Sequence, residues 1–101
     1  MSEGYAYTSV STKPDERMRV TTSFYLDGRA HLELYEVGET RPFVTLELGN
    51  TQVHIGPRAD GQVTDQDVAI FRDLAAKTAE LLAEVERLHA EQSEQSGHAA
   101  A

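Results

Sequence analysis

The chain has 101 residues, with 17 acidic and 9 basic side chains, a net charge of -8 and no cysteine. This length suits one small domain, and the lack of cysteine excludes disulfides, thiolate metal sites and cysteine nucleophiles. The negative charge opposes non-specific binding to nucleic acid, because such binding depends on Lys and Arg displacing counterions.

No apolar run approaches the ~20 residues that cross a bilayer, and the N-terminal residues have neither the basic nor the apolar region of a signal peptide. We therefore expect a soluble, cytoplasmic protein with no membrane contact. Seven Arg, two Lys and twelve Ala are typical of GC-rich coding sequence, which favours a bacterial or phage origin.

Residues 1–16 are rich in Ser, Thr, Gly and charged side chains. This composition predicts a flexible N-terminal arm. Tyr5, Tyr7 and Ser9 alternate with smaller or apolar residues, so a weak edge strand is the second interpretation.

Four segments of alternating polar and apolar residues follow, at 17–26, 29–37, 43–48 and 51–55. Period-2 alternation predicts strands with one buried face, and one long segment of period 3.6 after them predicts a helix. We expect an α+β fold, in which a four-stranded antiparallel meander is followed by a C-terminal helix packed on one sheet face.

Two turns set the expected register. A three-residue loop at 26–28 with a left-handed Gly28 pairs Phe24 with Ala30. The same register pairs Thr22 with Leu32 and Val20 with Leu34. A two-residue type II′ turn at Gly49-Asn50 pairs Leu48 with Thr51, Leu46 with Val53 and Val44 with Ile55. With these turns, the apolar residues of all four strands share one face.

The helix is expected to begin at Thr64, an N-cap residue with Asp67 as the capping-box acid, and to end near Gln92. A single domain would then span 17–92, and residues 93–101 would be a disordered tail. The apolar stripe of the helix follows a 3-4-3-4-3 spacing and consists of Phe71, Leu74, Thr78, Leu81, Val85 and Leu88.

One helix is too narrow for the predicted sheet. Four strands span about 19 Å, whereas a helix covers about 10 Å, and the stripe is longer than the shorter strands. We therefore predict a homodimer in which the stripe forms the interface. A monomer with a strongly curled sheet is the alternative.

The outer face of the sheet combines aromatic, Arg and His side chains. Cross-strand pairs explain this composition if the face is only solvated, whereas Tyr and Arg are also enriched at protein contacts. The residues expected to bind a protein partner are Arg19, Tyr25, Arg29, His31, Tyr35 and Phe43.

Chemistry-bearing motifs are weak. His31 and Glu33 share a strand face. His54 is expected on the strand 51–55, which the strand 43–48 separates from His31, so the two histidines are too far apart to share a metal ion. The segment 56–61 has two glycines and lacks the Lys-Ser/Thr of a phosphate loop. We predict no catalytic residues, no metal and no cofactor, and hence no enzyme.

Residues 65–94 of the helix carry eight acids and three bases, which amounts to -5 of the total charge. The leading hypothesis is a small non-enzymatic interaction module that acts as an accessory or regulatory protein. One alternative is a small-molecule binding protein or minor enzyme with a pocket at the dimer interface. Others are a nucleic-acid binder that uses the outer sheet face and an acidic nucleic-acid mimic.

Overall fold

The computed structural model describes residues 3–38, 41–58 and 62–100. Within them the fold is α+β, as predicted, with five strands and one C-terminal helix. The chain divides into two compact units, Met1–Asp60 and Gly61–Ala101. All strands belong to the first unit and the helix belongs to the second.

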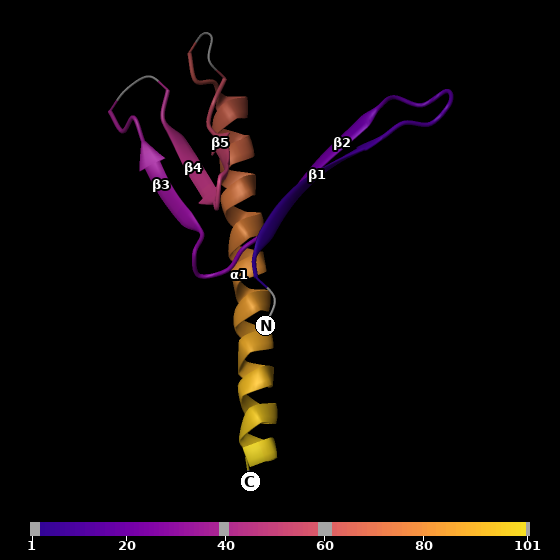
Figure 1. Cartoon of the computed structure of the whole chain (residues 1–101). Helices are drawn as coiled ribbons and strands as arrows, with labels where there is room; N and C mark the ends of the chain where they lie inside the picture. The colour runs from indigo at the N-terminus through magenta and orange to yellow at the C-terminus, as the bar shows by residue number, and fades with distance from the viewer. Residues whose placement is uncertain (1–2, 39–40, 59–61, 101) are drawn as a thin grey trace. The chain divides into compact units, whose positions relative to one another are not determined.

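The first two strands form a long antiparallel ribbon (Figure 1). Strand β1 (Tyr5–Ser11) pairs along its whole length with β2 (Arg19–Tyr25). Midway along the ribbon, the hydroxyl groups of Thr8 and Thr22 lie 3.0 Å apart and share a hydrogen bond. Of the two interpretations of the N-terminal segment, the strand is the one that the structure contains.

The predicted pairing of the second strand with the third is wrong, because β2 pairs with β1 instead. The expected loop does not form: Gly28 does not have a positive φ, and the Ala30 amide donates to the Asp27 carbonyl at 3.1 Å, which closes a turn. The Asp27 carboxylate also accepts a hydrogen bond from the Gly4 amide at 2.8 Å. The four-stranded meander is therefore replaced by a ribbon and a separate three-stranded sheet.

The remaining strands, β3 (His31–Tyr35), β4 (Phe43–Leu48) and β5 (Thr51–Ile55), form an antiparallel meander in the order β3-β4-β5. The register predicted for β4 and β5 is confirmed, with Leu48 opposite Thr51. Gly49 has φ 60° and Asn50 has no positive φ, as a type II′ turn requires.

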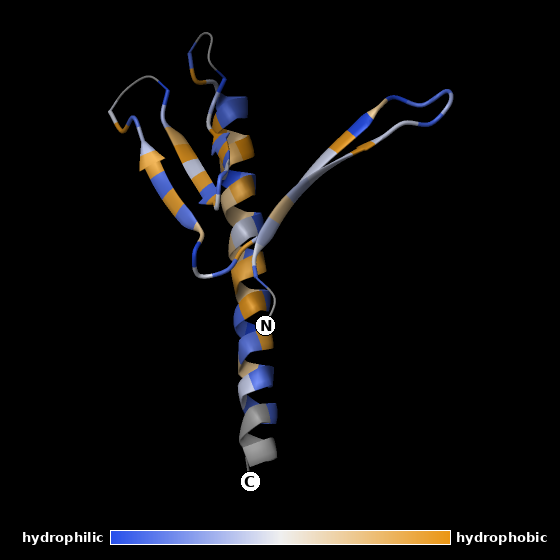
Figure 2. Cartoon of the chain, viewed as in Figure 1, coloured by the Kyte–Doolittle hydropathy of each residue, from blue (hydrophilic) through white to orange (hydrophobic). Residues whose placement is uncertain are grey.

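Little of the described chain is buried. Leu48 is 6% exposed and Thr45 is 4% exposed, and these are the only buried residues among those whose side chains the structure describes. The strands alternate between apolar and polar residues (Figure 2), so that one face of the β3–β5 sheet is apolar. On that face, Leu32 is 61% exposed and Leu34 is similarly open.

Helix α1 (Asp65–Ala100) begins at the predicted capping box. The Thr64 amide donates to Asp67 Oδ2 at 2.8 Å, and the Asp67 amide donates to Thr64 Oγ1 at 3.2 Å. The helix continues past the expected end at Gln92 and includes residues 93–100. No proline interrupts this segment, although Ser93, Ser96 and Gly97 are weak helix formers. No helix in the described ranges has the length and apolarity needed to span a membrane.

Candidate interaction surfaces

The six residues predicted to bind a partner do not lie on one sheet. Arg19 and Tyr25 belong to β2 of the ribbon, and Arg29 lies in the turn after it. The other three, His31, Tyr35 and Phe43, share one face of the β3–β5 sheet. The expectation that all six share one face is wrong, because it placed β2 beside β3, whereas β2 pairs with β1.

The polar face of the β3–β5 sheet carries a row of rings that crosses all three strands. Tyr35 and Phe43 stack at 5.5 Å between ring centroids, and Phe43 lies 4.9 Å from the His54 ring. The face also contains Thr45, which is buried at the centre of β4. We call this surface the aromatic face; it consists of His31, Glu33, Tyr35, Phe43, Thr45, Glu47, Gln52 and His54.

Glu33 links two of these rings. Its Oε2 atom accepts a hydrogen bond from the Tyr35 hydroxyl at 2.7 Å and lies 3.2 Å from His31 Nε2. The Tyr35 hydrogen bond, followed by the one to His31, lowers the pKa of Glu33, while the carboxylate raises the pKa of Tyr35. Glu33 is thus held ionised and Tyr35 protonated, which suits hydrogen bonding to a partner and leaves neither group activated as a base or nucleophile.

A second aromatic cluster lies on the ribbon. The rings of Tyr5, Tyr7 and Tyr25 are 5.1 to 6.1 Å apart between centroids. At this spacing the rings touch one another, so they form a patch and leave no room for a guest between them. The neighbouring Tyr7 raises the pKa of Tyr25. The alternation of Tyr5 and Tyr7 was the signal for this cluster, although it was assigned only to a possible edge strand.

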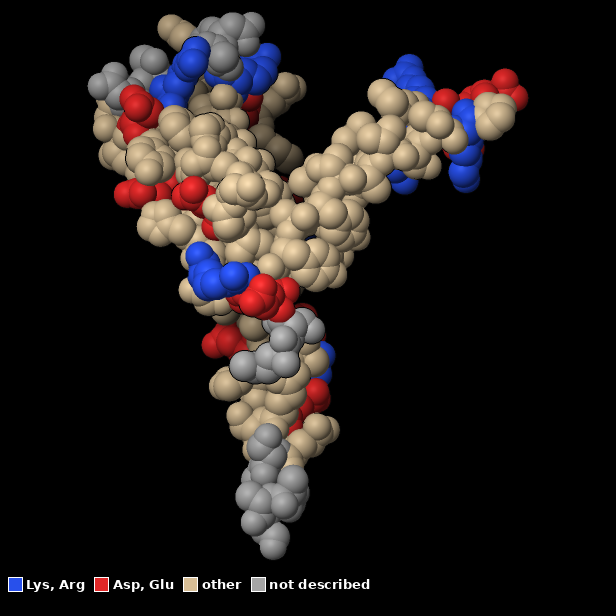
Figure 3. Space-filling view, viewed as in Figure 1, with Lys and Arg blue, Asp and Glu red and all other residues tan. Residues whose placement is uncertain are grey.

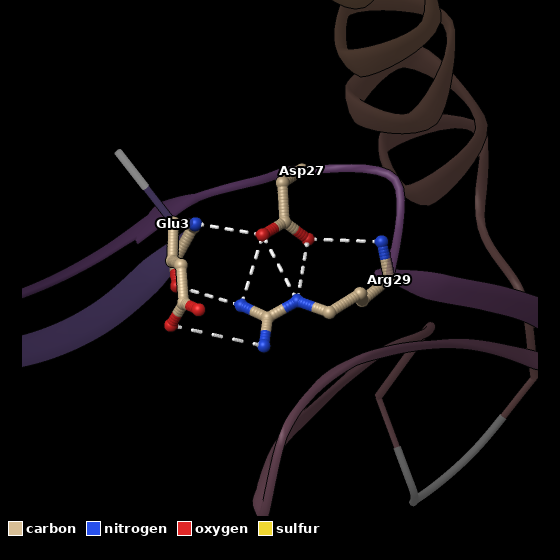
Figure 4. A network of polar contacts seen from close by, with 4 residues as sticks. Glu3, Asp27 and Arg29 are labelled. Atoms are coloured by element: carbon tan, nitrogen blue, oxygen red, sulfur yellow. Dashed lines mark hydrogen bonds and ion pairs between the residues drawn. The ribbon is translucent and has the colours of Figure 1, made fainter. Parts of the chain in front are cut away.

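Arg29 is held by contacts within the same chain. Its guanidinium lies 2.9 Å from Asp27 Oδ2 and donates to the Gly4 carbonyl at 3.4 Å, with Glu3 at 4.0 Å (Figure 4). The Asp27 carboxylate also accepts hydrogen bonds from the backbone amides of Gly4 and Arg29. Arg29, followed by these amides, holds the pKa of Asp27 far below its usual range. We call Glu3, Gly4, Asp27 and Arg29 the junction. It joins the start of β1 and the end of β2, at the open end of the ribbon, to the start of β3.

The turn end of the ribbon is charged. Figure 3 shows Lys and Arg beside Asp and Glu at this end, whereas the middle of the ribbon is uncharged in this view. An open hollow there is lined by Ser11, Lys13, Glu16, Arg17, Met18, Arg19 and Val20. It is exposed, and its lining combines both signs of charge.

The predicted dimer residues share one face of α1, which we call the helix stripe: Phe71, Leu74, Thr78, Leu81, Val85 and Leu88. Leu81 is 62% exposed, and Leu74, Val85 and Leu88 are also open. The Thr78 hydroxyl donates to the Leu74 and Ala75 carbonyls at 2.8 and 3.0 Å. Since its polar group is satisfied within the helix, Thr78 does not interrupt the apolar character of the stripe.

One flank of α1, beside the stripe, carries ion pairs between neighbouring turns. Lys77 lies 3.7 Å from Asp73 and 3.6 Å from Glu80, and Arg87 lies 2.9 Å from both Glu84 and Glu91. Exposed pairs at these spacings each contribute only a few tenths of a kcal/mol. This side therefore suits contact with water, and the stripe is the side that calls for a protein contact.

Among the described residues, no three His, Asp or Glu side chains gather as metal ligands. Comparison with protein-family models, with curated proteins and with solved structures found no match to this chain.

Proposed function

We propose that this protein is a non-enzymatic interaction module that works as a homodimer held together by the helix stripe. The observation that supports this proposal is the length of exposed apolar surface on α1. A single helix has no way to cover its own stripe, so the stripe needs another apolar surface.

The sheet of the same chain is too short to be that surface alone. From Val68 to Leu88 the apolar side of the helix is about 30 Å long, at ~1.5 Å per residue. The longest strand of the β3–β5 sheet, β4, has 6 residues and therefore spans about 20 Å. At least a third of this apolar side would remain uncovered by this sheet. The same stripe on a second copy, with its a/d-like spacing, matches it in length and in chemistry.

The aromatic face supplies the contact surface for a protein partner in this proposal. It presents Tyr, Phe and His rings together with ionised Glu33 on a rigid sheet, and rigid aromatic side chains lose little conformational entropy on binding. The Tyr35–Glu33 and Phe43–His54 contacts fix the ring positions before a partner arrives. Such a preformed face favours a partner that also offers planar and hydrogen-bonding groups.

The test is the solution mass, measured by light scattering after size exclusion. We expect the unmodified chain to have twice the 11.2 kDa of one chain. Leu81→Glu places a charge in the middle of the stripe and should shift the protein to a monomer or unfold it.

Ala83→Glu is the matched control, because it adds the same charge two residues away. At 100° per residue, position 83 lies on the side of the helix opposite the stripe. This variant should keep the doubled mass. A monomeric unmodified chain, or a doubled mass for Leu81→Glu with an unchanged melting curve, would contradict the helix-mediated dimer.

A further inference from the structure

We infer that β2 of one copy pairs with β3 of a second copy, so that the ribbon of each chain extends the sheet of the other. In the described part of the chain, β1 is the neighbour of β2, β4 is the neighbour of β3, and neither strand has a partner on its other edge. A free edge presents a row of backbone N–H and C=O groups that can pair with another strand. This strand interface and the helix-mediated dimer of the proposed function both require two copies of the chain, but they use different surfaces.

The side-chain pattern of the two edges is complementary. In an antiparallel pairing that places Thr22 opposite Leu32 of the second copy, Val20 lies opposite Leu34. The apolar side of the ribbon then continues the apolar face of the β3–β5 sheet, because β1 already places Val10 opposite Val20 and β4 places Val44 opposite Leu34. A shift of one residue would place apolar side chains on both faces.

Charge also favours these two edges. In this register Arg19 lies diagonal to Glu33 of the second copy, within reach of a long side chain. Strands β1 and β5 contain no charged residue, so their edges offer no such pair. Two β3 edges aligned on their leucines would place Glu33 opposite Glu33, which is unfavourable.

The junction explains why the second copy, and not the same chain, supplies the strand. The turn closed by Ala30 and Asp27, together with the Asp27 bonds to Gly4 and Arg29, holds the chain between the strands in a shape that does not pair β2 with β3. A second chain is free of this constraint. Exchange of identical elements between two copies is a common route to a dimer.

The absence of cysteine allows a direct test by disulfide trapping. Thr22→Cys and Leu32→Cys chains are mixed in equal amounts, oxidised, and analysed by non-reducing mass spectrometry. Residues directly opposite in an antiparallel pair have the Cα separation that a disulfide needs. We expect the mixed Thr22→Cys and Leu32→Cys dimer to form in at least tenfold excess over either homodimer.

Thr8→Cys is the matched control in place of Thr22→Cys. Thr8 lies directly opposite Thr22 on the same side of the ribbon, but its strand would be one position further from β3, beyond disulfide reach. Equal trapping of Thr8→Cys and Thr22→Cys with Leu32→Cys would overturn the inference. A single chain that carries both Thr22→Cys and Leu32→Cys gives a second test. A disulfide between these two cysteines within one chain would also overturn the inference.

Repeating the mixture with Leu81→Glu in both chains separates this inference from the helix-mediated dimer. If the mixed disulfide still forms when both chains carry Leu81→Glu, the strand interface does not need the stripe. This outcome supports the strand interface when the unmodified chain also has the mass of a dimer. A dimeric unmodified chain that gives no mixed disulfide overturns the strand interface and leaves the helix-mediated dimer standing.

Discussion

Single residues decide where the strands of this protein pair. Asp27 uses both carboxylate oxygens, with Oδ2 accepting from the Gly4 amide at 2.8 Å and Oδ1 accepting from the Arg29 amide at 2.9 Å. These bonds bring the start of β1 to the end of β2. The ribbon therefore owes its pairing in part to one side chain outside its strands.

The pH dependence of the junction follows from the sign of the Asp27 shift. Arg29 and the two amides hold the pKa of Asp27 below its ordinary value of 3.8. A lowered pKa means that the carboxylate stabilises the folded ribbon fully above that value, and that this contribution is lost as the pH falls through the folded pKa. The chemical shift of the Gly4 amide, followed by NMR from pH 6 to pH 2, should stay constant until the pH is below about 4.

Asp27→Asn is the control for this titration, because the amide has no proton to gain. In this variant the Gly4 shift should lose its acid-dependent change. A wild-type Gly4 amide that titrates at or above the ordinary Asp value would show that the junction does not hold the carboxylate ionised.

At the scale of the elements, turns and caps with a strong local signal were predictable. The Gly49-Asn50 turn, the register of β4 with β5 and the capping box of α1 all follow from residues within a few positions of one another. The ribbon was not predictable in this way, because the Gly4–Asp27 contact joins residues 23 positions apart. The same missed contact removed Arg19, Tyr25 and Arg29 from the aromatic face.

Two glycine substitutions test the role of turn geometry. Gly49 has φ 60°, and an alanine there would have to adopt this positive φ at a cost on the order of 1–3 kcal/mol. We expect Gly49→Ala to lower the urea midpoint of unfolding. Gly28 has no positive φ, and a methyl group added to its Cα would meet open space, so Gly28→Ala should leave the midpoint unchanged or raise it slightly. Equal effects of the two changes would contradict the type II′ turn.

For the whole molecule, folding and association are expected to be one process. The described chain buries only Leu48 and Thr45, whereas large apolar side chains are open on the sheet, the ribbon and the helix. A chain with so small a core gains little hydrophobic stabilisation by itself. In the proposed dimer, the second copy supplies the missing apolar contacts.

A dimer of this kind should melt at a temperature that depends on its concentration. Association stabilises the folded form by mass action, so the Tm measured by circular dichroism should rise as the protein concentration increases a hundredfold. The Leu81→Glu variant should show a weaker dependence, because it loses the helix-mediated contact and keeps only the strand interface. A Tm that stays constant for the unmodified chain would show that one copy is stable alone.

The small number of buried residues also affects how fast the protein is degraded in a cell. If the folded state requires two copies, newly made chains remain open to proteases until they meet a partner, and their survival increases with the rate of synthesis. Below a threshold of expression most chains would be degraded, and above it the protein would accumulate steeply. A doubling of gene dosage near that threshold would then raise the amount of protein more than twofold.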